Sequence, residues 1–259
     1  MSDTMSRFLP GTFAPDPRPA SRAQMLTAQT RLELKLLLRN GEQLLLTMFI
    51  PITLLIGLTL LPFGDLGNHR VDRIVPMVMM TAVMSTAFTG QAIAVGFDRR
   101  YGALKRLGAT PLPRWGVIAG KSAAVLIVVV LQAMLLGAIG LALGWRPGLG
   151  GLALGALVIA LGTATFAAMG LLLGGTLKAE VVLALANILW FIMLGIASLV
   201  LVDSLPAALT VVARLIPSGA LAFALDSALT GSIDWFGVAV LAAWGLVCGW
   251  LATRLFRFH

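Results

Sequence analysis

Residues 117–143 read VIAGKSAAVLIVVVLQAMLLGAIGLAL, and beyond Lys121 this run contains no Asp, Glu, Lys or Arg. An apolar run of about 18 residues or more can cross the roughly 30 Å hydrocarbon core of a bilayer as one helix. Similar runs lie on both sides of it, at residues 44–61, 74–95, 149–173, 181–202 and 235–252. The sequence therefore predicts an all-α integral membrane protein with six transmembrane helices.

The composition supports a membrane protein and excludes several kinds of site. Apolar residues make up 59% of the chain and charged residues 12%, whereas a soluble domain is about 45–50% apolar. The single cysteine, Cys248, cannot form an internal disulfide and is interpreted as a small packed residue. His69 and His259 lie outside the predicted spans, so no span supplies a pair of haem ligands. We expect no metal site, no catalytic residue and no cofactor bound by this chain.

The basic residues predict the orientation of the chain in the membrane. Fifteen of the nineteen Lys and Arg residues fall in 1–43, 99–121, 178 and 253–259, which an even number of spans places on one side. Loops rich in Lys and Arg stay cytoplasmic, so both termini are predicted to be cytoplasmic. The net charge of +8 is assigned to these loops and to lipid headgroups, and we expect no nucleic-acid partner.

The N-terminal region precedes the first span and differs from it. Residues 1–20 contain four prolines and no continuous apolar run, which predicts a disordered cytoplasmic tail that is not a signal peptide. Residues 21–43 are predicted to form an amphipathic interfacial helix, because Arg31, Lys35 and Arg39 recur every four residues. The alternative is a cytosolic extension of the first span. The six-helix domain is expected at 44–254, followed by a short cytoplasmic end at 255–259.

The segment 203–234 does not resemble a solvated loop. Its runs 207–216 and 219–229 are largely apolar but too short to span a membrane. Pro206 precedes the first run and Pro217 lies between the two. We expect two short re-entrant helices in the outer leaflet that form an outer gate. The alternative is a protein-covered surface hairpin without a gating role.

The segment between the second and third spans, GFDRRYGALKRLGATPLPRWG at 96–116, is the most concentrated polar feature of the chain. Its pattern predicts a short surface helix with charged ends and an apolar middle, which can dock in a groove of a soluble partner. In this interpretation Asp98, Arg99 and Arg100 open the helix. Tyr101, Leu104 and Leu107 lie near one another beside Lys105 and Arg106, Gly102 allows close approach, and Pro111 ends the helix. The alternative is an ordinary basic loop.

A phosphate-loop pattern at the end of this segment is a chance match. Gly116, Gly120, Lys121 and Ser122 lack the spacing of G-x-x-x-x-G-K-[ST], and they open a membrane helix instead of following a strand. We therefore expect that this chain does not bind ATP, and that Lys121 snorkels to the cytoplasmic headgroups.

Polar residues within the spans are candidates for a substrate pathway. Thr81, Ser85 and Thr89 share one face of an α-helix, and Gln132 and Asn187 add isolated amides. A pathway lined by them would be uncharged and suited to hydrophobic compounds; the alternative is hydrogen bonding to helix backbone. Glycines four residues apart, at 140/144, 151/155, 170/174 and 245/249, favour close helix packing, mostly within the chain.

The order of these features resembles the permease subunits of type-2 ABC exporters, similar to bacterial drug-resistance and lipid export permeases. The resemblance covers nearly the whole chain. It rests on Asp98-Arg99, Gly102, Leu107, Pro111 and Gly120-Lys121, on Leu205-Pro206 and Ile216-Pro217, and on residues 184–187 in the fifth span. Asp98 stands where Glu is more usual, and Arg100 and Lys105 stand where acidic residues are common, so the segment is unusually basic.

The resemblance implies several properties that the residues alone do not. Segment 96–116 would be the coupling segment that contacts an ABC ATPase, and ATP and Mg²⁺ would be bound by that partner. Two ATPase copies and a second permease chain, identical in the simplest case, would complete the transporter in a bacterial-type plasma membrane. The substrate exported would be a drug-like compound or a lipid.

Other functions fit the sequence less well. An ion-coupled carrier usually needs an ionisable residue within a span, and the predicted spans have none in their middle. A non-transporting membrane scaffold would keep the docking element but transport nothing. A membrane enzyme is least favoured, because no span offers paired carboxylates, a His cluster or a nucleophile with a base.

Overall fold

The computed structural model describes residues 20–61, 70–110, 112–201 and 205–256, and every regular element in these ranges is helical. This confirms the all-α fold class. The predicted tail 1–20, apart from Ala20, lies outside the described residues, as do Pro111 and residues 257–259. The elements are α1 (Arg22–Arg39), α2 (Gly41–Leu60), α3 (Arg70–Val83), η1 (Met84–Gly90), α4 (Gln91–Arg100), α5 (Ala103–Gly108), α6 (Arg114–Ala142), α7 (Leu149–Thr176), α8 (Ala179–Ala197), η2 (Ser198–Leu201), α9 (Ala207–Leu215), α10 (Pro217–Leu229) and α11 (Trp235–Leu255).

Five helical stretches in the described residues are long and apolar enough to cross a membrane. They are Arg70–Arg100, Arg114–Ala142, Leu149–Thr176, Ala179–Leu201 and Trp235–Leu255, which correspond to five of the six predicted spans. The remaining predicted span, 44–61, coincides with α2. The apolar part of α2, Thr47–Leu60, is shorter than the five long stretches. The chain is therefore a multi-pass helical membrane protein, and its sixth span remains a prediction.

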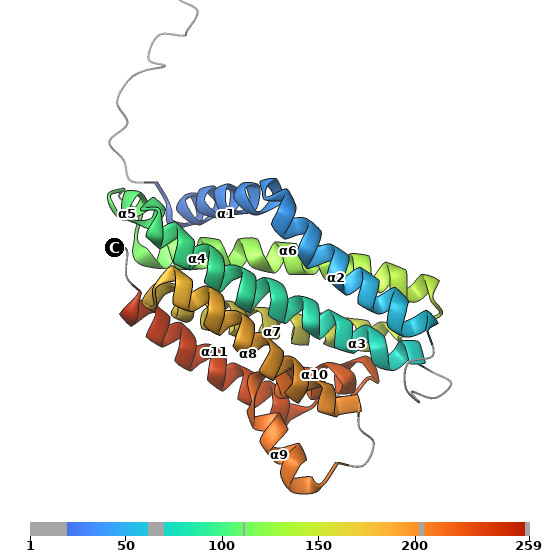
Figure 1. The fold of residues 1–259 in the computed structure, drawn as a ribbon. Helices are drawn as coiled ribbons and strands as arrows, with labels where there is room; N and C mark the ends of the chain where they lie inside the picture. Colours follow the sequence, from blue (N-terminus) through green and yellow to red (C-terminus); the bar gives the residue numbers. More distant parts are fainter. Residues whose placement is uncertain (1–19, 62–69, 111, 202–204, 257–259) are drawn as a thin grey trace, which may run out of the picture.

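The stretch formed by α3, η1 and α4 is the central rod of the bundle (Figure 1). It is the most buried of the five long stretches, because α6, α7, α8 and α10 all pack against parts of it. Its large side chains Met80, Met84 and Phe88 are fully buried in the main core cluster. The rod therefore connects the two ends of the molecule through the middle of the core.

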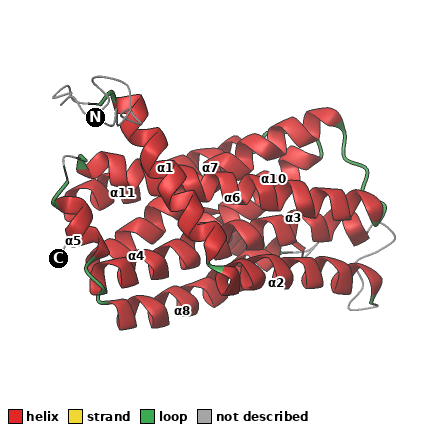
Figure 2. Cartoon of the chain, turned by 90° about the horizontal axis from the view of Figure 1, so that it is seen from above, coloured by secondary structure: helices red, strands yellow, loops and turns green. Residues whose placement is uncertain are grey.

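The helices run between two ends of the bundle, and one end gathers the functional candidates. Helix α5 and the C-terminal end of α11 lie together at that end in both views, and α1 starts beside them (Figures 1 and 2). The turns joining α6 to α7 and α10 to α11 lie at the opposite end. We call the first the α5 end. The predicted topology also places the N-terminal helix, the 96–116 segment and the C-terminus on one side.

Glycines on α7 allow this helix to pack closely on the central rod. A Cβ atom added at Gly170 would lie 2.8 Å from the carbonyl oxygen of Phe88, and one at Gly174 would clash with the carbonyl oxygen of Ala92. Gly151 and Gly155 contact Leu229 of α10 in the same way. These pairs serve packing within the chain, as predicted. Gly144 differs, because it occupies a turn at φ 101° with open space around it.

Helices α9 and α10 form the pair expected between the last two spans, bent by 105° between them. Helix α10 is largely buried and packs on α3, α7, α8 and α11. By contrast, α9 exposes Leu209, Val211, Val212 and Leu215. Protein therefore covers α10, in keeping with the alternative interpretation of a covered hairpin, whereas the exposed apolar face of α9 suits lipid.

Candidate functional site

The candidate site begins where the central rod ends. Asp98, Arg99 and Arg100 form the last turn of α4, and Tyr101 caps it. Gly102 follows with a φ of 74°, a left-handed conformation that glycine adopts without steric cost, and α5 begins after it. The prediction that residues 98–100 open the short helix is therefore wrong in this detail. They end the long helix, because the chain changes direction at Gly102.

Helix α5 is attached to the bundle by its leucines. Leu104 is fully buried and packs in an apolar cluster with Val95, Val117, Leu171, Ala252 and Phe256, and Leu107 packs against this cluster. Tyr101 is 71% exposed and stacks on Phe97 with ring centroids 5.9 Å apart. Leu104 and Leu107 thus meet as expected. The aromatic ring of Tyr101 lies outside their cluster.

The basic side chains of this region cover its outer surface. Lys105 and Arg106 are exposed on α5. Arg100 forms an ion pair of 2.5 Å with Glu180, with both side chains at least half exposed, so the pair contributes little stability. Arg99 donates from Nη1 to the carbonyl oxygen of Gly174 at 3.4 Å. The surface therefore has a positive charge that a partner could contact.

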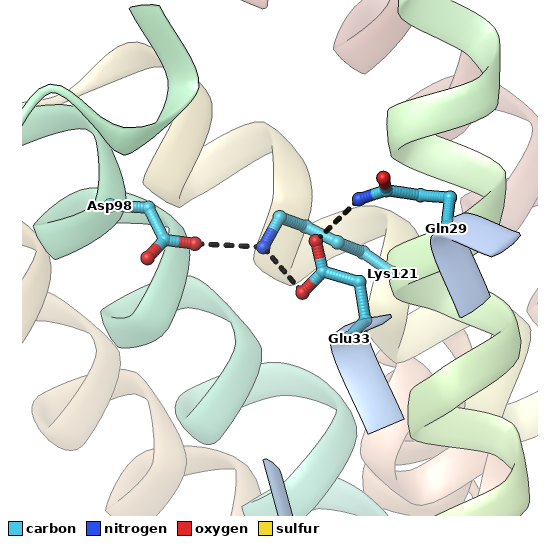
Figure 3. A network of polar contacts seen from close by, with 4 residues as sticks. All are labelled: Gln29, Glu33, Asp98 and Lys121. Carbon is cyan, nitrogen blue, oxygen red and sulfur yellow. Dashed lines mark hydrogen bonds and ion pairs between the residues drawn. The ribbon is translucent and has the colours of Figure 1, made fainter. Parts of the chain in front are cut away.

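A buried ionic network lies beside this surface and joins three helices (Figure 3). The ammonium group of Lys121 on α6 lies 2.9 Å from Oε2 of Glu33 on α1 and 2.7 Å from Oδ2 of Asp98 on α4. The Nε2 of Gln29 donates to Oε1 of Glu33 at 2.7 Å. We call these four residues, Gln29, Glu33, Asp98 and Lys121, the Lys121 network.

The structure corrects the expectation that Lys121 snorkels to headgroups. Its side chain is 7% exposed, because two carboxylates satisfy its charge inside the protein. Glu33 was not among the predicted site residues. The signal available was weak: Glu33 is the only acidic residue of 22–39 and lies four residues after Gln29, which predicts a shared helix face.

A close approach of α1 to α6 shapes this network. A Cβ atom added at Gly120 would lie 2.9 Å from the Cβ of Gln29. Gly120 therefore allows the polar face of α1, with Gln29 and Glu33 buried, to lie directly on α6. Arg31, Lys35 and Arg39 of the predicted basic stripe are exposed.

The predicted pathway residues differ in burial and in hydrogen bonding. Thr81 donates to the carbonyl oxygen of Met77 at 2.8 Å, within its own helix. Asn187 is exposed on α8 and donates to the carbonyl oxygen of Leu183 at 2.7 Å. Ser85 and Thr89 are half-buried, and the Oγ1 of Thr89 has no hydrogen-bond partner in the described part of the chain.

Gln132 is buried, and its partner is a threonine that the sequence pattern missed. The hydroxyl of Thr86 donates to Oε1 of Gln132 at 2.9 Å, and Nε2 of Gln132 donates to the carbonyl oxygen of Thr47 at 3.0 Å. Thr86 lies in η1, a π-helix whose i→i+5 hydrogen bonds change the spacing of side chains. The expected face of Thr81, Ser85 and Thr89 assumed an α-helical period throughout.

At the opposite end, the two predicted gate prolines begin helices. Pro206 is the N-cap of α9, and Pro217 occupies the first turn of α10. Arg214 of α9 forms an ion pair with Asp234, just before α11, and the indole N–H of Trp244 donates to the carbonyl oxygen of Leu215 at 3.1 Å. These contacts hold α9 against α11. Across the described ranges, no group of three or more His, Cys, Asp or Glu could hold a metal ion.

Comparison with protein families gave a match. Residues 63–254 match a family described as ABC-2 family transporter protein, from just after α2 almost to the end of α11. The matched region includes α5, Asp98 and Lys121. No curated protein matched the chain.

Proposed function

Because the chain belongs to the ABC-2 family of transporter proteins, we propose that it is the permease subunit of an exporter powered by a separate ATPase docked on the coupling segment, residues 96–116. A permease of this family is a membrane transport component, not the ATPase itself, and family membership implies an ABC ATPase as partner. The direction of transport, the substrate and the docking surface belong to the proposal.

The burial of Leu104 is the observation that best supports this role for the coupling segment. A short helix that moved freely on the surface could bind a partner without affecting the membrane domain. Here Leu104 is fully buried among residues of α4, α6, α7 and α11, and packed interiors transmit displacement because they contain few voids. A force on α5 would therefore reach four helices at once.

The charge of the coupling segment indicates the chemistry of its partner surface. Lys105 and Arg106 are exposed on α5, and Tyr101 adds an exposed aromatic ring beside them. Complementary charge across an interface steers association and suppresses wrong partners. We expect an acidic groove on the ATPase, with Tyr101 packing at its centre.

The transporter would contain two such permease chains, identical in the simplest case, and two ATPase copies. In this arrangement α2 is the sixth span, both termini are cytoplasmic, and the α5 end faces the cytoplasm. The unequal distribution of Lys and Arg supports this orientation. ATP and Mg²⁺ would be bound by the ATPase subunits.

A hydrophobic or amphiphilic substrate, a drug-like compound or a lipid, fits the interior best. Gln132, Thr81 and Thr86 are uncharged and already hydrogen-bonded, so a strongly polar substrate would find few free partners there. Methionines 77, 80 and 84 on the central rod can repack around varied apolar shapes.

Co-purification tests the docking surface. The chain is extracted from its native membranes in mild detergent, bound proteins are identified by mass spectrometry, and ATP hydrolysis is measured. We expect a stoichiometric ATPase subunit that is lost from the double variant Lys105→Glu with Arg106→Glu.

The matched control reverses two basic residues on an exposed face of α1, Arg31→Glu with Lys35→Glu, and should retain the ATPase. Recovery of the unaltered chain without any nucleotide-binding subunit would reject the proposed function. Retention of the ATPase by the α5 double variant would reject only the docking site.

A further inference from the structure

Two packing units, which contact each other through α6 and α7, meet at the α5 end of the bundle. Helix α4 packs mainly on α7 and α8, whereas α1 packs along α6. The backbones of α4 and α6 scarcely contact each other, and neither do those of α1 and α4. At the α5 end, the side chain of Lys121 joins α1 and α6 to α4, beside the apolar cluster around Leu104.

The two halves of the Lys121 network are unequal. Glu33 is 9% exposed and its second oxygen accepts a hydrogen bond from Gln29, so the pair Glu33 and Lys121 is enclosed within the α1 and α6 unit. Asp98 is 37% exposed. Water can therefore solvate Asp98 as it leaves Lys121, whereas separating Glu33 from Lys121 would leave a buried charge unpaired.

Asp98 is also close in sequence to the coupling segment's turn. It lies in the last turn of α4, and the chain changes direction at Gly102 before entering α5. A displacement of α5 that tilts the end of α4 therefore acts on the contact between Asp98 and Lys121. The enclosed contact to Glu33 lies on the other side of the ammonium group (Figure 3).

We propose that Lys121 is a positioning residue: with Asp98 it forms a separable latch between the coupling segment and the α1 and α6 unit, and with Glu33 it forms the fixed half of that latch. The pair is closed in this structure. Opening it frees α4 and α5 to move relative to α1. The link to ATP rests on the proposed function, but the latch itself is a property of the isolated permease.

Distance measurements between spin labels test the latch without an ATPase. Labels are placed at Thr27 on α1 and at Ala109, the residue that caps the C-terminal end of α5, both exposed, in a Cys248→Ala background, with labelled chains diluted by unlabelled ones. We expect one narrow distance distribution for the parent chain. Asp98→Asn removes the ion pair of the closed state, so molecules with a longer distance between the labels should make up more than about 10% of the sample. A minor conformation is ordinarily populated at or below that level.

Two further variants separate the latch from a general structural role. Lys121→Arg keeps a cation between both carboxylates and should keep the narrow distribution. The triple variant Asp98→Lys, Lys121→Asp and Glu33→Gln restores opposite charges across the latch without leaving Asp and Glu face to face, and should also restore the narrow distribution.

A narrow distribution in Asp98→Asn, or a triple variant as broad as Asp98→Asn, would overturn the latch. In the purified complex, ATP with Mg²⁺ should populate the same longer distance in the parent chain, and an unchanged distance there would also overturn it. A chain recovered without an ATPase would instead reject the proposed function, because the measurements on the isolated permease do not depend on that partner.

Discussion

At the α5 end a single ammonium group faces two carboxylates, and this imbalance determines how the site can respond. Lys121 can neutralise one of them, so the network has a surplus negative charge when Glu33 and Asp98 are both ionised. Burying an unpaired charge costs several kcal/mol, and Asp98 is the member that reaches solvent. The exposure of Asp98 is thus what makes the network stable when closed and able to open.

Sequence could not reveal this network, although every residue in it was visible. Lys121 and Glu33 are 88 residues apart in the chain, and Lys121 and Asp98 are 23 apart. Snorkelling is the usual behaviour of a lysine near a helix end, and no local pattern shows that a carboxylate on another helix will cover it. The short surface helix α5 was predictable because its signals are local: a basic run, Gly102 and prolines between two spans.

The hydrogen bond between Thr86 and Gln132 provides a prediction at the residue scale. Thr86→Val keeps the shape of the side chain but removes the donor to a buried amide oxygen. We expect a loss of roughly 1 kcal/mol in the free energy of unfolding, because a buried polar group left unpaired costs about 1–3 kcal/mol in general and interhelical bonds in membranes are somewhat weaker. Unfolding in SDS followed by circular dichroism measures this loss.

Thr81→Val is the matched control, because Thr81 is equally buried but bonds to its own helix backbone. Its effect should stay within about 0.5 kcal/mol. Equal losses in the two variants would show that the interhelical bond contributes nothing specific.

Helix α7 depends on small residues, because Gly151, Gly170 and Gly174 bring it against backbone atoms of neighbouring helices. Side chains can move aside, but the carbonyl oxygens of Ala87 and Phe88 near Gly170 belong to η1 and cannot shift without deforming the central rod. The glycine spacing in the sequence predicted close packing of this helix. It did not identify the π-helix as part of the surface on which α7 packs, because the seven residues Met84–Gly90 do not reveal an i→i+5 pattern.

Adding one methyl group on α7 tests this contact. Gly170→Ala places a Cβ 2.8 Å from the oxygen of Phe88 and 3.0 Å from that of Ala87, and overpacking of this kind costs about 1–3 kcal/mol. We expect lower thermal stability in detergent, measured as a fall in Tm.

Gly150→Ala on the same helix is the control, because Gly150 is exposed and has open space around its Cβ position. Alanine is the better helix former by about 1 kcal/mol, so this variant should be unchanged or slightly more stable. A Gly170→Ala variant as stable as Gly150→Ala would mean that the backbone of η1 moves to accommodate the added methyl group at little energetic cost. The central rod would then be more deformable than its burial indicates.

At the scale of the whole molecule, the topology depends on whether the α9 and α10 pair crosses the membrane. In Figure 1, α8 leaves the α5 end and α11 returns to it, so the α9 and α10 pair begins and finishes in the opposite half. This favours a re-entrant hairpin over a broken span. The sequence predicted the hairpin from two apolar runs too short to span. A protein-covered hairpin was the alternative prediction, but the sequence did not show that α3 and α7 would cover α10, because these helices are distant from it in sequence.

Labelling of single cysteines from outside the cell tests this topology in full. In a Cys248→Ala background, we expect a membrane-impermeant maleimide to label Ala208→Cys and Ser232→Cys in intact cells, because Ala208 is exposed in the first turn of α9 and Ser232 is exposed after the end of α10. Gly108→Cys and Lys178→Cys at the α5 end should be labelled only after permeabilisation, because the excess of Lys and Arg at that end predicts a cytoplasmic surface.

If Ala208→Cys and Ser232→Cys were labelled from opposite sides, α9 and α10 would form a broken span. The C-terminus would then lie on the opposite side of the membrane from the coupling segment. Labelling of all four positions in intact cells would instead show that the reagent enters, and a C-terminal fluorescent-protein fusion, bright only in the cytoplasm, would then decide the side of α11 independently.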